Sequence, residues 1–110
     1  MNSVYLVKQI DDEKYKVGVT KDIEQRLRTL QVSNPEKLEL ITTFESQDWA
    51  YKIEAAFKRN YKPKRTLGEW FRLDKNDVTD FLTFCAKKDS DFKYMYEHNE
   101  FFRNTIDRGR

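Results

Sequence analysis

The first half of the chain carries short apolar runs with the two-residue period of β-strands. Residues 3–9, SVYLVKQ, are rich in β-branched and aromatic side chains, and residues 15–20, YKVGVT, follow a polar DDEK turn. This order predicts an antiparallel hairpin. One face of its second strand is expected to carry three apolar side chains, those of Tyr15, Val17 and Val19. The opposite face is expected to carry Lys16, Gly18 and Thr20.

The apolar period changes to that of a helix after the hairpin. Residues 21–31, KDIEQRLRTLQ, place apolar side chains at i, i+4 and i+7, which predicts an amphipathic helix. The members of this apolar stripe are Ile23, Leu27 and Leu30. Thr20 or Asp22 is expected to cap the start of the helix. After the break SNP, residues 37–45, KLELITTFE, are predicted to form a third strand.

The second half of the chain is predicted to be mainly helical. Helices are expected over residues 46–61 and 74–88, separated by a basic loop and by the short extended segment 69–73, EWFRL. These elements together predict an α+β fold, a small three-stranded antiparallel sheet flanked by helices. One domain is expected over residues 1–88, and residues 89–110 are expected to form a C-terminal helical tail.

The tail is polar and charged, but it also carries several aromatic side chains. They are Phe92, Tyr96, Phe101 and Phe102. Such side chains are too apolar to remain in solvent, so we expect them to dock on the domain, on a second copy of the chain or on a protein partner.

Composition limits the class of protein. The single cysteine, Cys85, excludes a disulfide within the chain, and the single histidine, His98, argues against a zinc site built from cysteine and histidine clusters. Asp11 and Asp12 interrupt the N-terminal apolar run before it reaches the length of a signal peptide. We therefore expect a cytoplasmic protein without a membrane-spanning segment.

Positive charge is concentrated although the net charge of the chain is only +2. One eight-residue window holds five basic side chains, Lys58, Arg59, Lys62, Lys64 and Arg65. Such a window is either an ordinary solvated surface or a set of contacts to nucleic-acid phosphates. Beside a phosphate site, the second interpretation is favoured, and it predicts affinity that falls with salt.

Four short motifs occur in an order that resembles the GIY-YIG nuclease family. VYL lies on the first strand, KVG lies on the second, an arginine follows that glycine by eight residues, and a glutamate lies on the next helix. The later GEWF, residues 68–71, resembles a sub-branch common in phage and microbial genomes, whose second motif often reads K-[IV]-G. The resemblance covers residues 3–74.

This resemblance implies a DNA endonuclease that hydrolyses phosphodiester bonds with one divalent metal ion, Mg²⁺ or Mn²⁺. Carried onto this chain, it implies a general base at Tyr5 assisted by Lys16, a phosphate-binding Arg26 and a metal-binding Glu54. Low intrinsic sequence specificity is expected, because 110 residues leave no room for an added DNA-binding module. RNA remains an alternative substrate. Structural roles are expected for Gly18, Thr20, Gly68 and Trp70.

The chain also departs from the family pattern. VYL lacks the first glycine, Lys16 replaces a tyrosine, and Leu30 stands where many members have histidine or tyrosine. The alternative is therefore a degenerate module that binds nucleic acid or a protein partner without cleavage.

The expected positions of Arg26 and Glu54 on their helices are compatible with the roles that the resemblance implies. At 100° per residue, Arg26 falls at the edge of the apolar stripe, where its planar fork can reach over the sheet toward phosphate oxygens. Arg28 points away from the stripe and is grouped with the basic window as a DNA contact. Glu54 lies at the margin of the buried face, and a single carboxylate is enough for a hard cation completed by water and phosphate.

Each of these residues also has an ordinary structural interpretation. Arg26 can be a solvated helix arginine, and Glu54 can form a simple i, i+4 pair with Lys58. Tyr5 can be a core tyrosine, and Lys16 can be an exposed strand lysine. The glycine at position 18 either leaves room for a substrate or a neighbouring side chain, or marks a β-bulge.

Overall fold

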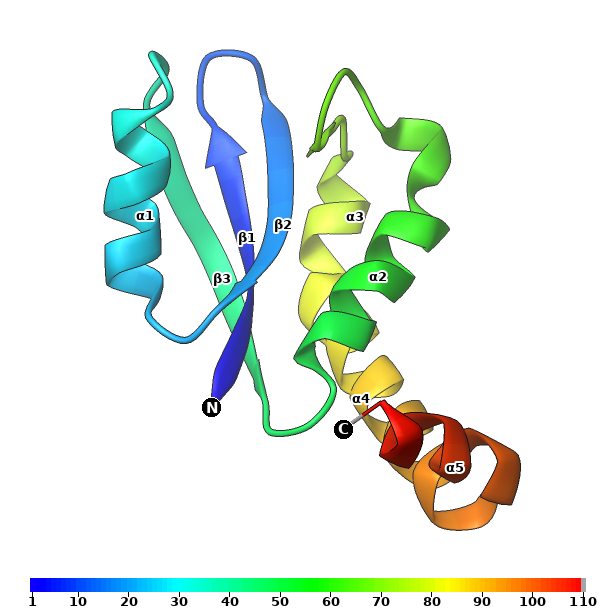
Figure 1. Cartoon of the computed structure of the whole chain (residues 1–110). Helices are drawn as coiled ribbons and strands as arrows, with labels where there is room; N and C mark the ends of the chain where they lie inside the picture. Colours follow the sequence, from blue (N-terminus) through cyan, green and yellow to red (C-terminus); the bar gives the residue numbers. More distant parts are fainter. Residues whose placement is uncertain (110) are drawn as a thin grey trace.

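A computed structural model describes residues 1–109, which form a mixed fold of strands and helices (Figure 1). Its sheet is antiparallel throughout, with the strand order β3-β1-β2-β4. The strands are β1 (Asn2–Gln9), β2 (Lys14–Thr20), β3 (Leu38–Ser46) and β4 (Trp70–Phe71). The predicted α+β class is confirmed, and the predicted hairpin corresponds to β1 and β2.

The sheet has four strands, where the sequence predicted three. The additional strand is β4, which pairs only Tyr15 with Phe71 and Lys16 with Trp70. A two-residue strand has too short a pattern to be distinguished from an extended loop. Its consequence is local, because β4 covers only the first part of β2 and leaves the rest of that strand as a sheet edge.

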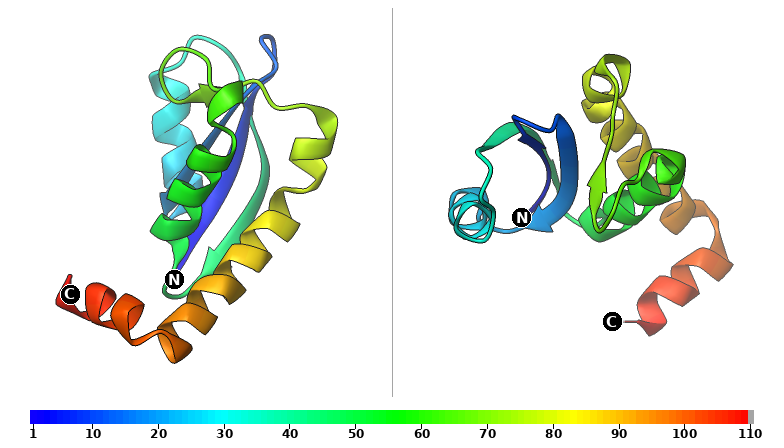
Figure 2. Two further views of the ribbon diagram at one scale, coloured as in Figure 1. Left: turned by 90° about the vertical axis from the view of Figure 1, so that its right-hand side faces the viewer. Right: turned by 90° about the horizontal axis from the view of Figure 1, so that it is seen from above.

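Helices lie on both faces of the sheet, so the molecule has three layers (Figure 2). The helices are α1 (Ile23–Val32), α2 (Ala50–Asn60), α3 (Lys75–Thr79), α4 (Phe81–His98) and α5 (Glu100–Arg108), with a short 3₁₀ helix, η1 (Lys62–Lys64). The helix α1 covers one face, where Leu30 packs against Tyr5 and Val7. The helices α2 and α4 cover the other face.

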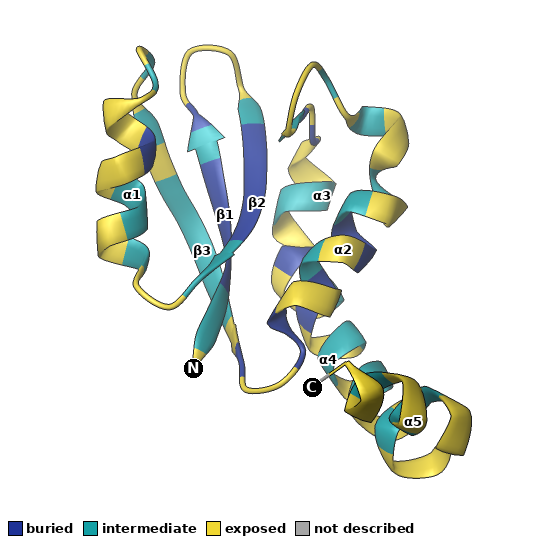
Figure 3. Cartoon of the chain, in the orientation of Figure 1, coloured by how far each residue is buried: buried dark blue, intermediate teal, exposed yellow. Residues whose placement is uncertain are grey.

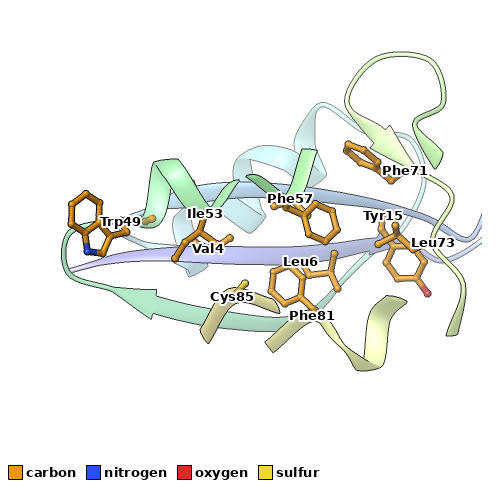
Figure 4. Packing of buried hydrophobic residues seen from close by; sticks show 12 residues of the cluster. Val4, Leu6, Tyr15, Trp49, Ile53, Phe57, Phe71, Leu73, Phe81 and Cys85 are labelled. Carbon is orange, nitrogen blue, oxygen red and sulfur yellow. The ribbon is translucent and has the colours of Figure 1, made fainter. Parts of the chain in front are cut away.

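The larger core lies between the sheet and the helices α2 and α4 (Figure 4). Strand side chains from one face of the hairpin, Val4, Leu6, Tyr15 and Val17, meet helix side chains that include Ile53, Phe57, Phe81 and Cys85. The predicted division of β2 into an apolar face and a face carrying Lys16 and Gly18 is therefore confirmed. Burial raises the pKa of the Cys85 thiol to about 12, as expected for a cysteine in an apolar core.

The region predicted as one helix over residues 74–88 is divided in two. Asp80 ends α3 and begins α4, and α4 then continues past Lys88 to His98. Helical structure in the tail is confirmed, since α4 and α5 account for residues 89–98 and 100–108. None of the described helices is long and apolar enough to cross a membrane.

The tail folds back on the domain through aromatic contacts with Trp49. Its ring centroid lies 6.0 Å from that of Phe92, 5.8 Å from that of Tyr96 and 6.0 Å from that of Phe102. Phe101 was expected to dock with them, but it is 79% exposed because it lies on the outer side of α5. Figure 3 shows that exposed residues cover most of this end of the molecule.

Candidate functional site

Gly18 is a glycine because the ring of Tyr5 crosses it. The two residues lie opposite each other in the β1–β2 pairing. A Cβ atom built on Gly18 would stand 2.2 Å from the Tyr5 hydroxyl oxygen. The Tyr5 side chain is too closely packed in the interior to move away from such an atom. Of the two interpretations of this glycine, room for a neighbour is correct. The irregularity in pairing lies instead between Leu6 and Val7, on the β3 side of β1.

The start of α1 fixes the position of Arg26 over the same ring. Asp22 caps the helix by accepting a hydrogen bond from the backbone N–H of Gln25, and the hydroxyl of Thr20 accepts one from the N–H of Asp22. Arg26 lies in the first turn that follows, and its Nε donates to the Tyr5 hydroxyl at 3.2 Å. Because this bond uses Nε, it does not involve the two Nη groups of the guanidinium fork.

Lys16 is buried on the same face of the sheet, with only 9% of the residue exposed. Its ammonium donates to Glu69 Oε2 at 2.5 Å and lies 5.9 Å from the centre of the Trp70 ring. An exposed strand lysine is therefore the wrong interpretation of this residue. The pKa of Glu69 lies below its usual range, chiefly because of the hydrogen bond from Lys16.

Glu54 reaches the site from α2, on the opposite side of the β2 edge from α1. The ammonium of Lys58 lies 3.5 Å from Glu54 Oε2 and 3.9 Å from Glu69 Oε1. The predicted i, i+4 pair therefore exists, but it is part of a larger network. Lys58 connects the carboxylate on α2 with the carboxylate that precedes β4.

These side chains line one small pocket of about 110 Å³, which we call the site pocket. Its polar and glycine lining consists of Tyr5, Lys16, Gly18, Arg26, Glu54, Lys58 and Glu69. The four residues predicted as catalytic thus converge, although they come from β1, β2, α1 and α2. Three cationic side chains face two carboxylates, so the pocket retains an excess of positive charge suited to an anion.

The carboxylates of the pocket suit a metal ion that needs few protein ligands. Among the described residues, no group of three or more histidine, cysteine, aspartate or glutamate side chains can hold a metal ion. Mg²⁺ nevertheless binds through one or two carboxylates when water and substrate phosphate supply the other oxygens. Glu54 is partly buried in the pocket wall and offers such a carboxylate.

A second, larger hollow of about 460 Å³ adjoins the site pocket, and we call it the basic groove. It is lined by Ala55, Lys58, Arg59, Lys62, Arg65, Glu69 and Phe71. Lys58 and Glu69 also line the site pocket, so the two hollows are neighbours that share one wall. The structure therefore gathers four of the five residues of the basic window beside the site.

The other two predicted DNA contacts lie elsewhere in the described structure. The ammonium of Lys64 contacts Asp74 at 3.2 Å and also contacts Asp77, and these hydrogen bonds raise the pKa of Lys64. Lys64 therefore fastens η1 to the start of α3. Arg28 is exposed on α1 and is not among the residues that line the site pocket or the basic groove.

The residues with expected structural roles occupy special positions. Gly68 adopts a φ of +72°, the left-handed region that favours glycine, in the turn before β4. Trp70 is half-buried beside the Lys16 ammonium, whereas Phe71 enters the core. Glu69, between Gly68 and Trp70, was not predicted as a site residue. The signal that could have identified it is Lys16, because a lysine on a buried strand face needs a carboxylate partner.

Comparison with known proteins places the chain in a family. No curated protein and no solved structure matches it. The family model described as the T5orf172 domain matches residues 2–86, which include every residue of the site pocket and the basic groove. The chain belongs to the T5orf172 domain family.

Proposed function

We propose that this T5orf172 domain is a metal-dependent endonuclease of the GIY-YIG type, which hydrolyses DNA phosphodiester bonds with low intrinsic sequence specificity. One observation carries the proposal. Tyr5, Lys16, Arg26 and Glu54, which are far apart in the sequence, line a single pocket with an excess of positive charge. The basic groove adjoins that pocket and would bind the flanking strand.

Arg26 is the residue that would bind the scissile phosphate. Its Nε is anchored on Tyr5, its side chain lines the site pocket, and this hydrogen bond does not use the two Nη groups. A planar guanidinium donates two parallel hydrogen bonds to phosphate oxygens, and these bonds strengthen as negative charge develops in the transition state.

Tyr5 is the proposed general base. Its hydroxyl lies in the wall of the site pocket, where it accepts the hydrogen bond from Arg26 Nε and lies close to Gly18. The Tyr5 oxygen would accept the proton of an attacking water that binds within hydrogen-bond reach of it.

Glu54 would hold the divalent cation. When bound, Mg²⁺ or Mn²⁺ supplies positive charge near the leaving oxygen. For this the Glu54 carboxylate must exchange its contact with Lys58 for the cation, which the 3.5 Å separation of the ion pair makes inexpensive.

The basic groove would bind phosphates that flank the scissile bond. Lys58, Arg59, Lys62 and Arg65 are suited to backbone contacts, which position a strand without reading its bases. This supports low sequence specificity. An RNA backbone presents the same phosphates, so the experiment below also measures cleavage of RNA.

Nicking of supercoiled plasmid tests the proposal. We expect the purified protein to produce open circles in Mg²⁺ or Mn²⁺, and EDTA to abolish them. A labelled RNA in the same buffers shows whether the activity extends to RNA. Absence of cleavage of either nucleic acid with every divalent ion tried would contradict the proposal.

A binding module without catalysis is the second candidate. It is favoured by the Lys58 contacts to both carboxylates and by Leu30, which is buried in the α1 core and offers no polar group to the site. Salt-sensitive DNA binding without cleavage would support this candidate.

A further inference from the structure

Glu69 joins two cations that belong to different parts of the site. Its Oε2 accepts from Lys16 on β2 at 2.5 Å, and its Oε1 lies 3.9 Å from the ammonium of Lys58 on α2. The side chains of both lysines are more buried than that of Glu69. The side chain of Lys16 is 11% exposed, whereas that of Glu69 is 62% exposed. An outer, solvated carboxylate thus covers an inner ammonium.

Glu69 lies in a turn closed by hydrogen bonds from the Thr66 N–H to the Trp70 carbonyl at 2.8 Å and from Arg65 Nε to the Gly68 carbonyl at 2.7 Å, so any movement belongs to its side chain. Gly68, at φ +72°, precedes it, and Leu67 is 94% exposed. The strand β4 that follows has only two residues. The Lys16 side chain extends from a paired strand and is 11% exposed, whereas the Glu69 side chain is 62% exposed. When the contact between them breaks, Glu69 is the side chain that moves into solvent.

We propose that Glu69 is an internal anion that occupies a phosphate-binding position between Lys16 and Lys58, and that a substrate phosphate displaces it. This inference rests on the proposed function, because it takes a nucleic-acid phosphate as the ligand of the site pocket. Glu69 and Lys58 line both the site pocket and the basic groove, so the displaced position lies where a strand would pass from one to the other.

The chemistry of the contacts favours exchange over a permanent pair. A carboxylate and a phosphate diester each carry one negative charge and accept hydrogen bonds from an ammonium through two free oxygens. An exposed carboxylate gives up such a contact at little cost, because water replaces it. Lys16 is too buried to be hydrated in the same way, so it requires an anion at all times.

Phosphate binding to the metal-free protein tests the inference without any cleavage. Inorganic phosphate is titrated in EDTA into ¹⁵N-labelled protein, and the amide signals of Lys16 and Gly18 give the dissociation constant. Removing the competing charge by Glu69→Gln should tighten phosphate binding about two- to fivefold, the range expected for an exposed ion pair. The control Glu24→Gln removes an exposed carboxylate from the first turn of α1 and should change the constant less than about 1.5-fold.

A second pair of variants identifies the position. In a Lys16→Met background, Glu69→Gln should tighten phosphate binding less than it does in the wild type, because one of the two shared partners is gone and only Lys58 remains. The inference is overturned if Glu69→Gln leaves the constant unchanged, if Glu24→Gln has an equal effect, if the gain is undiminished without Lys16, or if no variant shows saturable shifts. Plasmid nicking is scored separately, so a gain in phosphate binding without cleavage contradicts the nuclease alone.

Discussion

The fit between Gly18 and Tyr5 is the most demanding single-residue feature of the site. We predict that Gly18→Ala lowers the free energy of unfolding by about 1–3 kcal/mol, because the added methyl group would overlap the buried Tyr5 ring. Urea denaturation measures this. The control is Gly109→Ala, where the nearest atom to an added Cβ, the carbonyl oxygen of Ile106, lies at 3.5 Å.

The same substitution should also disturb the chemistry, because Tyr5 carries the hydrogen bond from Arg26. If Gly18→Ala were as stable as the Gly109→Ala control, the close approach of Tyr5 to this glycine would be wrong.

At the scale of elements, the period of the hydrophobic residues was sufficient to predict the longer helices and strands. The hairpin, α1, β3 and α2 were all predicted, since each has an apolar face of at least three positions. The break at Asp80 and the strand β4 were not. The strand β4 depends on the pairing of Phe71 with Tyr15, a contact between distant segments. The break lies at Asp80, which ends α3 and begins α4 without interrupting the apolar pattern.

The capping box of α3 gives a pH-dependent prediction. The pKa of Asp74 is lowered, first by the hydrogen bond from the Asp77 backbone and then by Lys64. A lowered pKa in the folded state means that ionised Asp74 stabilises the fold above the unfolded value of about 3.9 and that this contribution is lost as pH falls through the folded value. Asp74→Asn keeps the cap oxygen but not the charge.

We therefore expect Asp74→Asn to melt below the wild-type temperature at pH 7, with a difference that shrinks below about pH 4. Thermal melts followed by circular dichroism across this range provide the measurement. A difference that stayed constant to pH 2 would show that the charge of Asp74 is not its cause.

Docking of α5 depends on one face of that helix. Phe102 stacks on Phe92 with ring centroids 6.4 Å apart and contacts Trp49, and Lys52 lies 5.6 Å above its ring. Phe102→Ala should cost about 1–3 kcal/mol, less than for a fully buried phenylalanine. The neighbouring Phe101→Ala should cost less than about 0.5 kcal/mol because its ring is exposed. Equal effects in urea denaturation would contradict the docked position of α5.

At the scale of the whole molecule, the sequence motifs identified the residues of the site but not the contacts among them. Arg26 and Glu54 were predicted from the resemblance to the GIY-YIG family, since their places at the edges of two helices also suit ordinary surface residues. Glu69 was missed, because its role depends on a long-range contact with Lys16, 53 residues earlier in the chain. Lys64 was grouped with the basic window, since no periodic pattern reveals that Asp74 and Asp77 engage it.

The position of the basic groove predicts which arginine contacts DNA. Binding to a short duplex in EDTA should weaken with salt, and Arg59→Gln should reduce the slope of log K against log salt by about 0.9. Arg28→Gln, which removes the same charge from the exposed side of α1, should leave the slope nearly unchanged. Fluorescence anisotropy between low and moderate salt measures both. Equal slopes for the two variants would place the DNA outside the groove.

The role of Glu54 is the central claim, and cleavage and binding by Glu54→Gln test it most directly. The change removes a charge with little change in size, and an amide is a poor ligand for a hard cation. We predict that plasmid cleavage in Mg²⁺ falls by about 100-fold or more, because the loss of the metal site removes several kcal/mol of transition-state stabilisation. Duplex binding in EDTA should persist, since Arg26 and the basic groove remain.

Glu39→Gln, an exposed position on β3, is the matched control and should cleave as the wild type does. Both variants are compared at equal folded concentration and saturating Mg²⁺, so that a loss of cleavage reports on the site. The predicted result is full binding without cleavage for Glu54→Gln alone. Wild-type cleavage by folded Glu54→Gln would contradict the proposed mechanism.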